Sequence, residues 1–511
     1  MVNSVAVIGG GASGLTALKC CLDEGLTPTC FERSDHIGGL WHYTEKAKEG
    51  HTTVMKNTIA NVSKEVTAYS DFPPAPELPV YMHNMDLDEY LNMYADNFDL
   101  GKHIRLNTEV VHIYETEDHK VTGRWNVKVK DVTSDNTNLM TFDAVLICTG
   151  VFSRPFMPTY AGIEEFKGRL IHTQDYKNSK GCEDKRVVVV GIGNSAVDAA
   201  CDISDVCRQV YISSRNGSWI LARLSKNGHP IDMALFSRFT YTLVTLFPSL
   251  MNKLLMKQCN NKIDHFRYGI NPKYIPARSN STVNDQLPYK LLIGAIKMKP
   301  DIKRFCGNDV EFVDGTRIQN VDVVVFGTGY LPEFPFLDNS VIGEDKTQLY
   351  LGMFPRERQN HTLATIGCFR IKGPVLPIVE MQSRLAARVL KGEVTLPDRT
   401  TMYKNIRANI RESQEKRTYS IQAVMQLDYF PYMDQLAGMI GCKPNFLKLF
   451  FSDRALALKC VFGPATSYQY RLVGPGHWKV QGKPFLLSGT ELTIRLLKES
   501  RRQLHQESGV I

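Results

Sequence analysis

The sequence lacks any cysteine spacing typical of a redox pair or a zinc site. Its twelve cysteines are scattered, and neither a CxxC nor a CxxxxC spacing occurs among them. Catalytic disulfides and many zinc sites depend on such close spacings. A disulfide reductase is therefore disfavoured, and we expect no metal site. We expect the thiols to be reduced and mostly buried.

Long hydrophobic runs and clusters of basic residues are also missing. No stretch of about 18 consecutive apolar residues occurs, so the sequence predicts no membrane-spanning helix. The net charge of +8 is small for 511 residues, and no basic cluster is interleaved with aromatic residues. This charge suits anionic cofactors or an acidic membrane surface, and nucleic-acid binding is not expected.

What the sequence does contain is one larger unit that occurs twice: an apolar strand, a glycine-rich turn and a helix. Val5–Ile8 leads into Gly9–Gly14 and a helical stretch, and Arg186–Val190 leads into Gly191–Ala196 and another. Because the first strand enters its turn directly, we expect it to belong to the fold and not to a signal peptide. The length of the chain predicts two or three domains.

The first glycine turn has the features of a dinucleotide site. Gly9 permits the tight turn, Gly11 allows the backbone to approach a pyrophosphate, and Gly14 lets the helix pack closely on the strand. The N-terminus of the helix attracts phosphate. The next strand ends at Glu32, whose carboxylate suits ribose hydroxyls and repels a 2′-phosphate, so the site favours FAD or NAD over NADP.

The second glycine turn differs in the direction that NADPH requires. Ala196 replaces the third glycine, and the strand Gln209–Ser213 is followed by Ser214 and Arg215 instead of an acidic residue. A hydroxyl and a guanidinium can bind a 2′-phosphate through charge-assisted hydrogen bonds. Two such sites together predict hydride transfer from a nicotinamide to a flavin.

The fold class that follows is α/β, with two nested Rossmann-like dinucleotide-binding domains and a helical insertion in the second. The predicted boundaries are residues 1–153 for the first part of the FAD domain, 154–331 for the NADPH domain with its insertion at about 224–273, 332–445 for the returning part of the FAD domain, and 446–511 for a C-terminal segment.

The segment between the two units indicates what the reduced flavin does. Phe166, Gly168, His172 and Tyr176 occur at the spacing FxGxxxHxxx[FY]. This pattern resembles the fingerprint of flavin-containing monooxygenases of the animal microsomal type, and Tyr176 favours the N- and S-oxygenating group over the Baeyer–Villiger group. The resemblance covers nearly the whole chain. We interpret His172 as a residue that couples the two domains and not as an acid or base.

The resemblance implies a reaction sequence. NADPH reduces FAD, NADP+ stays bound, and O2 adds to the flavin C4a atom to give a hydroperoxide. A soft nucleophile, an amine nitrogen or a sulfide sulfur, then takes the distal oxygen. Asn61 matches the family residue at the reactive edge of the flavin, where an amide can donate and accept hydrogen bonds, and we assign it the catalytic role. Without the resemblance it would be a turn residue or a glycosylation site.

The resemblance also carries over the cofactor contacts. The expected FAD contacts are Gly9, Gly10, Gly11, Ala12, Ser13, Gly14, Glu32, Gly39, Leu40, Trp41, Asn61, Val62 and Gln382. The expected NADP contacts are Ala60, Asn61, Gly191, Gly193, Ser195, Ala196, Val197, Asp198, Ser214 and Arg215. Gln382 is placed at the start of a helix beside the flavin.

Apolar residues recur at helical spacing between residues 235 and 255, which predicts the helical insertion. It is either a membrane-facing or substrate-channel lid or an ordinary helical subdomain. The charged stretch at residues 495–505 replaces the apolar anchor that microsomal members carry. Two locations therefore stay open: the cytosolic face of the endoplasmic reticulum membrane, with peripheral contact through the insertion, and the cytoplasm. Homo-oligomerisation is the rival explanation for an exposed apolar insertion.

Two other activities are compatible with the cofactor motifs. One is Baeyer–Villiger oxygenation of ketones, and the other is NADPH oxidase activity that releases hydrogen peroxide. The partners expected in every case are O2 and, for the oxygenases, a small nucleophilic or carbonyl substrate.

Overall fold

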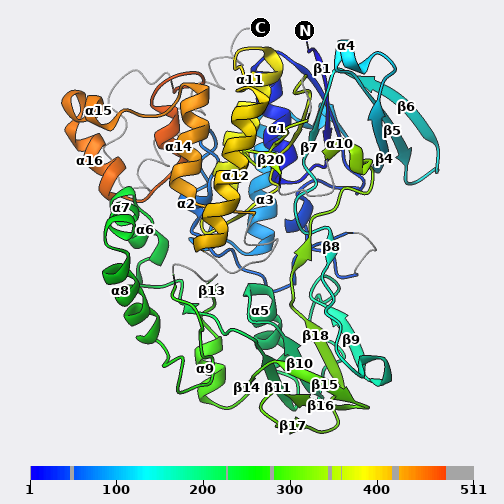
Figure 1. Ribbon diagram of the computed structural model, residues 1–511, viewed down its shortest axis with the longest axis vertical. Coiled ribbons are helices and arrows are strands. Elements are labelled where there is room, and N and C mark those ends of the chain that lie inside the picture. The colour runs from blue at the N-terminus through cyan, green and yellow to red at the C-terminus, as the bar shows by residue number, and fades with distance from the viewer. Residues whose placement is uncertain are drawn as a thin grey trace.

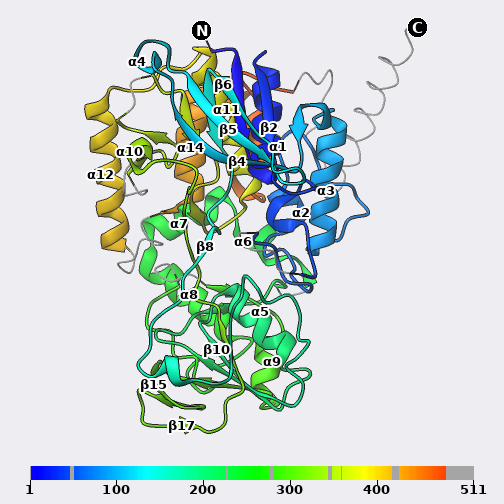
Figure 2. The same cartoon turned by 90° about the vertical axis from the view of Figure 1, so that its right-hand side faces the viewer.

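The computed structural model describes residues 2–46, 51–225, 228–276, 281–342, 348–357, 360–416 and 425–478. The charged stretch at residues 495–505, for which a helical ending without an anchor was predicted, lies outside these ranges. Two lobes are stacked along the long axis, each built on a parallel sheet (Figures 1 and 2). The predicted α/β class is confirmed.

The sheet of the upper lobe is parallel throughout and draws its strands from distant parts of the chain. Its order is β22-β7-β1-β2-β3. The strands are β1 (Ser4–Ile8), β2 (Thr27–Phe31), β3 (Ile104–Arg105), β7 (Ala144–Ile147) and β22 (Leu363–Thr365). Because β1 and β7 are buried along their whole length apart from Ser4, they are continuous apolar runs without alternation.

The sheet of the lower lobe repeats this design. Its order is β14-β11-β10-β18-β9, again parallel throughout. The strands are β9 (Arg169–His172), β10 (Arg186–Val190), β11 (Gln209–Ser213), β14 (Ile296–Lys299) and β18 (Val323–Phe326). The outer strand beside β18 precedes the unit in sequence, whereas its counterpart β22 follows the upper unit.

Each lobe also carries a three-stranded antiparallel sheet, which lies in sequence between β3 and β7 in the upper lobe and between β14 and β18 in the lower lobe. In the upper lobe it consists of β4 (Thr108–Glu115), β5 (Trp125–Asp131) and β6 (Thr137–Phe142); in the lower lobe it consists of β15 (Ile302–Cys306), β16 (Asp309–Phe312) and β17 (Arg317–Ile318). The two lobes therefore share an arrangement that goes well beyond the glycine turns.

The core of the upper lobe lies between its sheet and a layer of helices (Figure 1). The helix α1 (Ala12–Asp23) packs against α11 (Leu376–Lys391), and α11 packs against α14 (Tyr429–Ile440). The other helices of this lobe are α2 (Lys64–Thr67), α3 (Asn84–Asn97), α4 (His119–Thr122), α10 (Asn339–Ile342), α12 (Arg399–Lys416), α15 (Phe446–Ser452) and α16 (Arg454–Phe462), and those of the lower lobe's core are α5 (Asn194–Ile203) and α9 (Leu287–Leu292).

Two crossings join the lobes, and they are hydrogen-bonded to each other. The strand β8 (Arg154–Pro155) leaves the upper lobe, and β19 (Tyr330–Leu331) returns to it, in antiparallel pairing. The backbone N–H of Phe156 donates to Gly329 O at 2.9 Å, which extends this ribbon by one step. The lower lobe is therefore one continuous stretch of chain between its two crossings.

The insertion in the lower lobe forms the helices α6 (Ile231–Leu235), α7 (Arg238–Leu246) and α8 (Pro248–Asn260), and it reaches across to the upper lobe (Figure 1). The Phe236 ring lies 4.9 Å from Tyr429 and 5.3 Å from Phe430 of α14. Phe239 lies 4.9 Å from Phe462 of α16. Across the described ranges, no helix is long and apolar enough to cross a membrane.

Candidate functional site: two dinucleotide cradles and the loop between them

The first glycine turn is shaped by close backbone contacts. Gly9 has a φ of 102°, and its N–H donates to Phe31 O at 2.8 Å. A Cβ on Gly14 would lie 1.8 Å from Gly9 O, so only glycine lets α1 approach the turn. Gly39, with a φ of 56°, lies over Gly11 so closely that its Cβ would meet the Gly11 Cα at 2.9 Å. These contacts make a surface of bare backbone at the N-terminus of α1.

Glu32 is held beside this turn by three donors. Its Oε2 accepts from Gly10 N at 2.6 Å, and its Oε1 accepts from the N–H and hydroxyl of Ser34 at 2.9 and 2.7 Å. The carboxylate is buried at the end of β2. Its position next to the glycine turn is the one that a ribose-binding acid occupies in this type of fold.

The second glycine turn repeats a backbone hydrogen bond of the first. Gly191 has a φ of 114°, and its N–H donates to Ser213 O at 2.9 Å, as Gly9 donates to Phe31 O. Ala196 occupies the position of the third glycine, and its side chain fits because the residue that faces it is Gly327. A Cβ on Gly327 would lie 2.4 Å from the Cβ of Ala196. In the upper lobe the residue equivalent to Gly327 is Cys148, which faces Gly14.

The residues around the second turn differ in charge from those around the first. Arg215 is exposed two residues after β11. Ser214 lies between them, where its hydroxyl accepts from Gly217 N at 3.1 Å. Asp198, on α5, accepts from Asn284 Nδ2 at 2.8 Å, and burial raises its pKa to about 6. The helices that follow the two glycine turns, α1 and α5, have no acidic residue in their first turn. This suits a phosphate site, because a carboxylate there would repel the phosphate.

The fingerprint residues fasten the outer strand of the lower sheet. A Cβ on Gly168 would lie 2.5 Å from Asp322 O, so glycine allows β9 to start beside β18. Phe166 packs on Phe305 at 5.4 Å. His172 Nδ1 accepts from Gln174 N at 3.1 Å, so its Nε2–H donates to Gly329 O at 3.1 Å. Burial lowers the pKa of His172, which keeps this tautomer neutral.

The end of the fingerprint connects the lobes. Tyr176 donates to Asp202, which also accepts from Asn57 Nδ2 of the upper lobe at 2.8 Å. Lys177 Nζ donates to Thr53 O at 3.0 Å and Thr53 Oγ1 at 2.8 Å, and burial lowers its pKa to about 8. The coupling role was predicted for His172, whose own partners are Gln174, Gly329 and the ring of Tyr330, whereas the contacts with Asn57 and Thr53 come through Tyr176 and Lys177.

Asn61 lies in a loop that the lower lobe holds from two sides. Its Oδ1 accepts from Arg223 Nη2 at 3.0 Å. Asp232 of α6 accepts from the N–H of Ser63 at 2.7 Å, from its hydroxyl at 2.8 Å, and from Tyr81 OH at 3.0 Å. Arg223 and Asp232 were not recognised from the sequence, because their partners lie about 150 to 170 residues away and no local pattern connects them.

A cavity of about 500 Å³ opens beside this loop, at the junction of the lobes. It is lined by Ile59, Tyr81, Ile220, Ala222, Arg223, Leu224, Lys262, Asn284, Asp285 and Pro288. Mostly apolar walls with a few convergent polar groups are typical of a small-molecule site. Among the residues that the structure describes, no cluster of histidine, cysteine and acidic side chains is arranged to hold a metal.

Gln382 is placed differently from our expectation. It lies in the second turn of α11 instead of at its start, and it is fully buried. Its Oε1 accepts from Gly367 N at 2.8 Å, and its Nε2 donates to Tyr432 OH at 2.7 Å. A Cβ on Gly367 would lie 2.5 Å from Ser13 Oγ. The oxygen of the Gln382 amide thus holds the Gly367 backbone next to the first turn, and its nitrogen is taken up by Tyr432.

Two glycine turns at helix N-termini, one beside a buried glutamate and the other followed by a serine and an exposed arginine, are the arrangement expected of an oxidoreductase with a flavin and a nicotinamide cofactor. The Flavin-binding monooxygenase-like family model matches residues 2–508. The chain belongs to this family, and it is a flavin-dependent monooxygenase that uses FAD and NADPH.

Two relatives in sequence support the family, and one solved structure is similar in fold. Dimethylaniline monooxygenase (N-oxide-forming) 2 of Rattus norvegicus is 43% identical over 94% of this chain and 90% of its own. Flavin-containing monooxygenase 5 of Cavia porcellus is 43% identical over 94% of this chain and 91% of its own. The fold is similar to that of the S-allyl-L-cysteine S-oxygenase of Allium sativum, with a TM-score of 0.66, 22% identity and 99% of both chains covered.

Proposed function

We propose that this protein oxygenates small soft nucleophiles, amine nitrogen and sulfide sulfur, and that Asn61 is its catalytic residue. The observation that carries the proposal is the position of Asn61 at the junction of the lobes, where its amide accepts from Arg223, a residue that lines the mostly apolar cavity. The names of the relatives add support, since one forms N-oxides and another is an S-oxygenase.

The protein's own groups have three tasks in this proposal. Bound FAD, reduced by NADPH, supplies the oxygen-transfer chemistry. The glycine cradles and Glu32 position the flavin nucleotide, while Ser214 and Arg215 select NADPH. Asn61 donates a hydrogen bond toward the reacting centre, and the apolar walls of the cavity exclude water from it.

Product analysis with three probes tests the proposal. With NADPH and O2, a tertiary amine should give its N-oxide and a thioether its sulfoxide. A cyclic ketone should be converted far more slowly. Lactone as the main product would assign Baeyer–Villiger chemistry instead, and stoichiometric hydrogen peroxide with every probe would assign NADPH oxidase activity.

Two variants of Asn61 test whether its amide acts as a hydrogen-bond donor or whether its side chain only fills space. Asn61→Asp keeps an acceptor for Arg223 but removes the amide donor, and Asn61→Ala removes both. We expect both variants to bind FAD and to be reduced by NADPH at nearly the normal rate, and both to release most of the oxygen as peroxide. A fully coupled Asn61→Asp enzyme would contradict the donor role.

We also propose that the protein contacts the cytosolic face of the endoplasmic reticulum membrane through an apolar edge. This edge comprises exposed apolar side chains of α7, α8, α15 and α16 and the turns between them, which share one side of the molecule (Figure 1). Its residues are Leu246, Phe247, Leu250, Leu254, Leu447, Phe451, Leu458 and Phe462. Exposed lysines and arginines, including Lys253 and Arg454, border it, as expected at an anionic lipid surface.

Sedimentation with vesicles tests this contact. The holoenzyme should sediment with vesicles that contain anionic lipid, and Leu250→Glu should weaken this binding severalfold. Leu139→Glu is the matched control, since Leu139 is 56% exposed on β6 and Leu250 is 57% exposed on α8. Equal loss in both variants would contradict the proposal. Concentration-dependent dimers that Leu250→Glu abolishes would assign the edge to homo-oligomerisation.

A further inference from the structure

One guanidinium in the lower lobe contacts every residue from Ile59 to Asn61. Arg223 Nη2 donates to Ile59 O at 3.2 Å and to Asn61 Oδ1 at 3.0 Å, and Nε donates to Ala60 O at 3.1 Å. We propose that Arg223 is a positioning residue for the reaction: it fixes the Asn61 amide so that its Nδ2 is the end available to the cofactors. This inference rests on the proposed role of Asn61.

The orientation of the amide follows from the chemistry of its partner. A guanidinium has donors only, and a carboxamide has one acceptor atom, so the Asn61 atom that meets Arg223 must be the oxygen. Turning the amide over would place an NH2 group against the guanidinium N–H groups. With its oxygen already bound, Asn61 offers its two N–H donors to other partners.

Arg223 is itself held firmly enough to impose this orientation. Its Nη1 pairs with Asp285 Oδ2 at 3.0 Å, and its backbone N–H donates to Asp285 Oδ1 at 2.9 Å. The side chain is 10% exposed, and its guanidinium lies 6.0 Å from the Tyr81 ring. Four acceptor atoms, contributed by both lobes, therefore surround the planar guanidinium group. A lysine ammonium has neither the width nor the number of donors to satisfy them together.

The same stretch of the insertion also holds the loop beyond Asn61. Asp232 binds the N–H and hydroxyl of Ser63, and Tyr81 OH lies 3.0 Å from Asp232 Oδ1 and 2.8 Å from Arg223 O, so its single proton is shared between these two acceptors. Asn61 thus lies between two polar anchors that both come from the beginning of the insertion. The orientation of the amide depends on a segment of the other lobe and not on its own loop alone.

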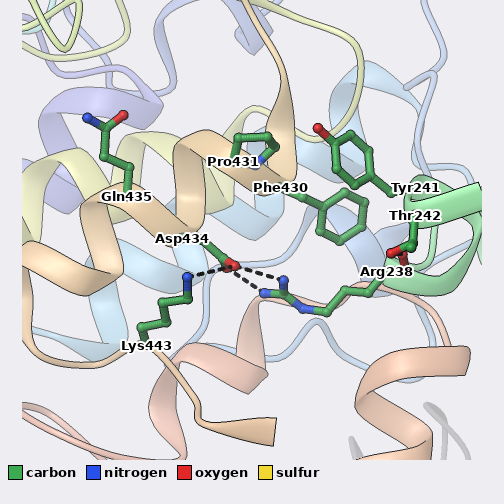
Figure 3. A pocket seen from close by; sticks show the side chains of 8 residues that line it. All are labelled: Arg238, Tyr241, Thr242, Phe430, Pro431, Asp434, Gln435 and Lys443. Atoms are coloured by element: carbon green, nitrogen blue, oxygen red, sulfur yellow. Dashed lines mark hydrogen bonds and ion pairs between the residues drawn. The ribbon is translucent and has the colours of Figure 1, made fainter. Parts of the chain in front are cut away.

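The test compares Arg223→Lys with a matched arginine of the same insertion. Arg238 is 12% exposed, donates to Asp434 at 3.0 and 2.6 Å, and contacts α14 and residues 469–470 instead of the Asn61 loop. Figure 3 shows Arg238 and Lys443 both directed at Asp434. Arg238→Lys therefore removes a buried bidentate arginine without touching the candidate site.

The readouts are flavin absorbance and unfolding temperature. In NADPH-reduced holoenzyme mixed with O2 and NADP+, Arg223→Lys should speed the return of oxidised flavin about tenfold, the factor that one hydrogen bond of about 1.4 kcal/mol corresponds to. The fraction of NADPH that ends as peroxide should rise with it, while anaerobic flavin reduction keeps its rate. In the Asn61→Ala background, Arg223→Lys should add nothing further to either.

Three outcomes would overturn the inference. These are a normal flavin return in Arg223→Lys, an equal acceleration in Arg238→Lys, or effects of Arg223→Lys and Asn61→Ala that multiply. If Arg223→Lys does not load FAD, Asp285→Asn replaces it and should change both readouts in the same direction but less; unchanged values would overturn the inference too. A wild-type enzyme that yields no oxygenated product would refute the proposed function, whereas the double-mutant cycle of unfolding temperatures would still measure the contact between Arg223 and Asn61.

Discussion

Glu32 directly follows β2, and Ser214–Arg215 directly follow β11. The two lobes therefore differ in charge at the position where a ribose is expected to bind. Glu32 is buried and engaged by Gly10 and Ser34, whereas Arg215 is exposed. A carboxylate repels a 2′-phosphate and a guanidinium attracts it. We therefore propose that the selection between dinucleotides depends on single side chains at the ends of otherwise similar strands.

Arg215→Ala should weaken NADPH binding by roughly ten- to a hundredfold, because charge-assisted hydrogen bonds contribute about 1.5 to 3 kcal/mol. NADH lacks the 2′-phosphate, so its binding should change by less than about twofold. Steady-state KM values for the two nucleotides, measured on the same preparation, check this. Equal losses for NADH and NADPH would remove Arg215 from the phosphate site.

Asp198 makes the stability of the nucleotide-free protein depend on pH. Its carboxyl has a pKa of about 6 in the folded protein and an ordinary value of 3.8. Between these values the folded state binds more protons than the unfolded state, so stability falls as pH rises from about 4 to about 6. Asp198→Asn keeps an acceptor for Asn284 and should raise stability at pH 7 by at most about 3 kcal/mol.

Thermal unfolding between pH 4 and pH 8, at about one-unit steps, measures the effect of Asp198→Asn. The gain over the wild type should be present at pH 7 and disappear near pH 4. Asp205→Asn is the control, since Asp205 is exposed in the same lobe and pairs with Lys290 on the surface. A gain that is constant across the pH range would show that Asp198 is not the titrating group.

At the residue scale, functional residues next to a recognisable motif could be predicted from the sequence. Interacting residues that are far apart in the sequence could not. Glu32 and Arg215 follow their strands within one or two positions, so the strand and turn identify them. Arg223 is separated from Asn61 by 162 positions, and Gln382 acts on Gly367 through a buried helix. Only the folded chain reveals such partners.

At the scale of elements, the two lobes show how one contact can be built from either side. In the upper lobe Gly14 provides the space, since a Cβ on it would lie 1.8 Å from Gly9 O, whereas in the lower lobe Gly327 makes room for Ala196. Ala196 is larger than the glycine that it replaces in the motif. The small residue on the facing strand compensates for it, and this could not be inferred from the glycine motif alone.

Gly168→Ala tests the pairing of the outer strand. Its Cβ would meet Asp322 O at 2.5 Å, so we expect β9 to be displaced from β18 and stability to fall by roughly 1 to 3 kcal/mol. Gly438→Ala is the control, because a Cβ there meets nothing within 4 Å on helix α14 and should stabilise by about 0.5 to 1 kcal/mol. Chemical denaturation of both variants gives the comparison; a Gly168→Ala protein as stable as Gly438→Ala would contradict it.

The boundaries of long, buried strands followed from the sequence, and those of short ones did not. β10 and β11 have the predicted bounds, because each is a mostly apolar run that stops at a turn. β8 and β19 have two residues each and are stabilised by each other across about 175 positions. The helices of the insertion were predicted from periodicity, but their packing on α14 and α16 depends on contacts between lobes.

At the scale of the whole molecule, Lys177 and Lys180 connect the same two parts of the chain with different strength. Lys177 is buried and donates to three oxygens, two on Thr53 and one on Gln174, at 2.8 to 3.0 Å. Lys180 reaches Glu45 on the surface, where its side chain is 78% exposed. Exposed ion pairs contribute little, whereas unsatisfied buried acceptors are costly.

Lys177→Met should therefore disturb the docking of the lobes, and Lys180→Met should not. We expect Lys177→Met to slow anaerobic reduction of the flavin at saturating NADPH by about tenfold or more, because hydride transfer requires the two cofactors to be aligned. Lys180→Met should stay within about twofold of the wild type. Stopped-flow absorbance of the flavin provides the rates, and similar rates in the two variants would disprove the role of Lys177.

Because β8 and β19 pair where the chain enters and leaves the lower lobe, this lobe could be removed or replaced as one unit. Arg154 and Leu331, where the chain enters and leaves, are backbone partners, so both ends of the lobe lie at one point on the surface of its neighbour. Removing residues 156–329 and joining the ends with a short turn would leave the upper sheet's strand connections in place. The same geometry would accept the corresponding lobe of a relative with another nucleotide preference, which makes cofactor choice a property that can be transplanted.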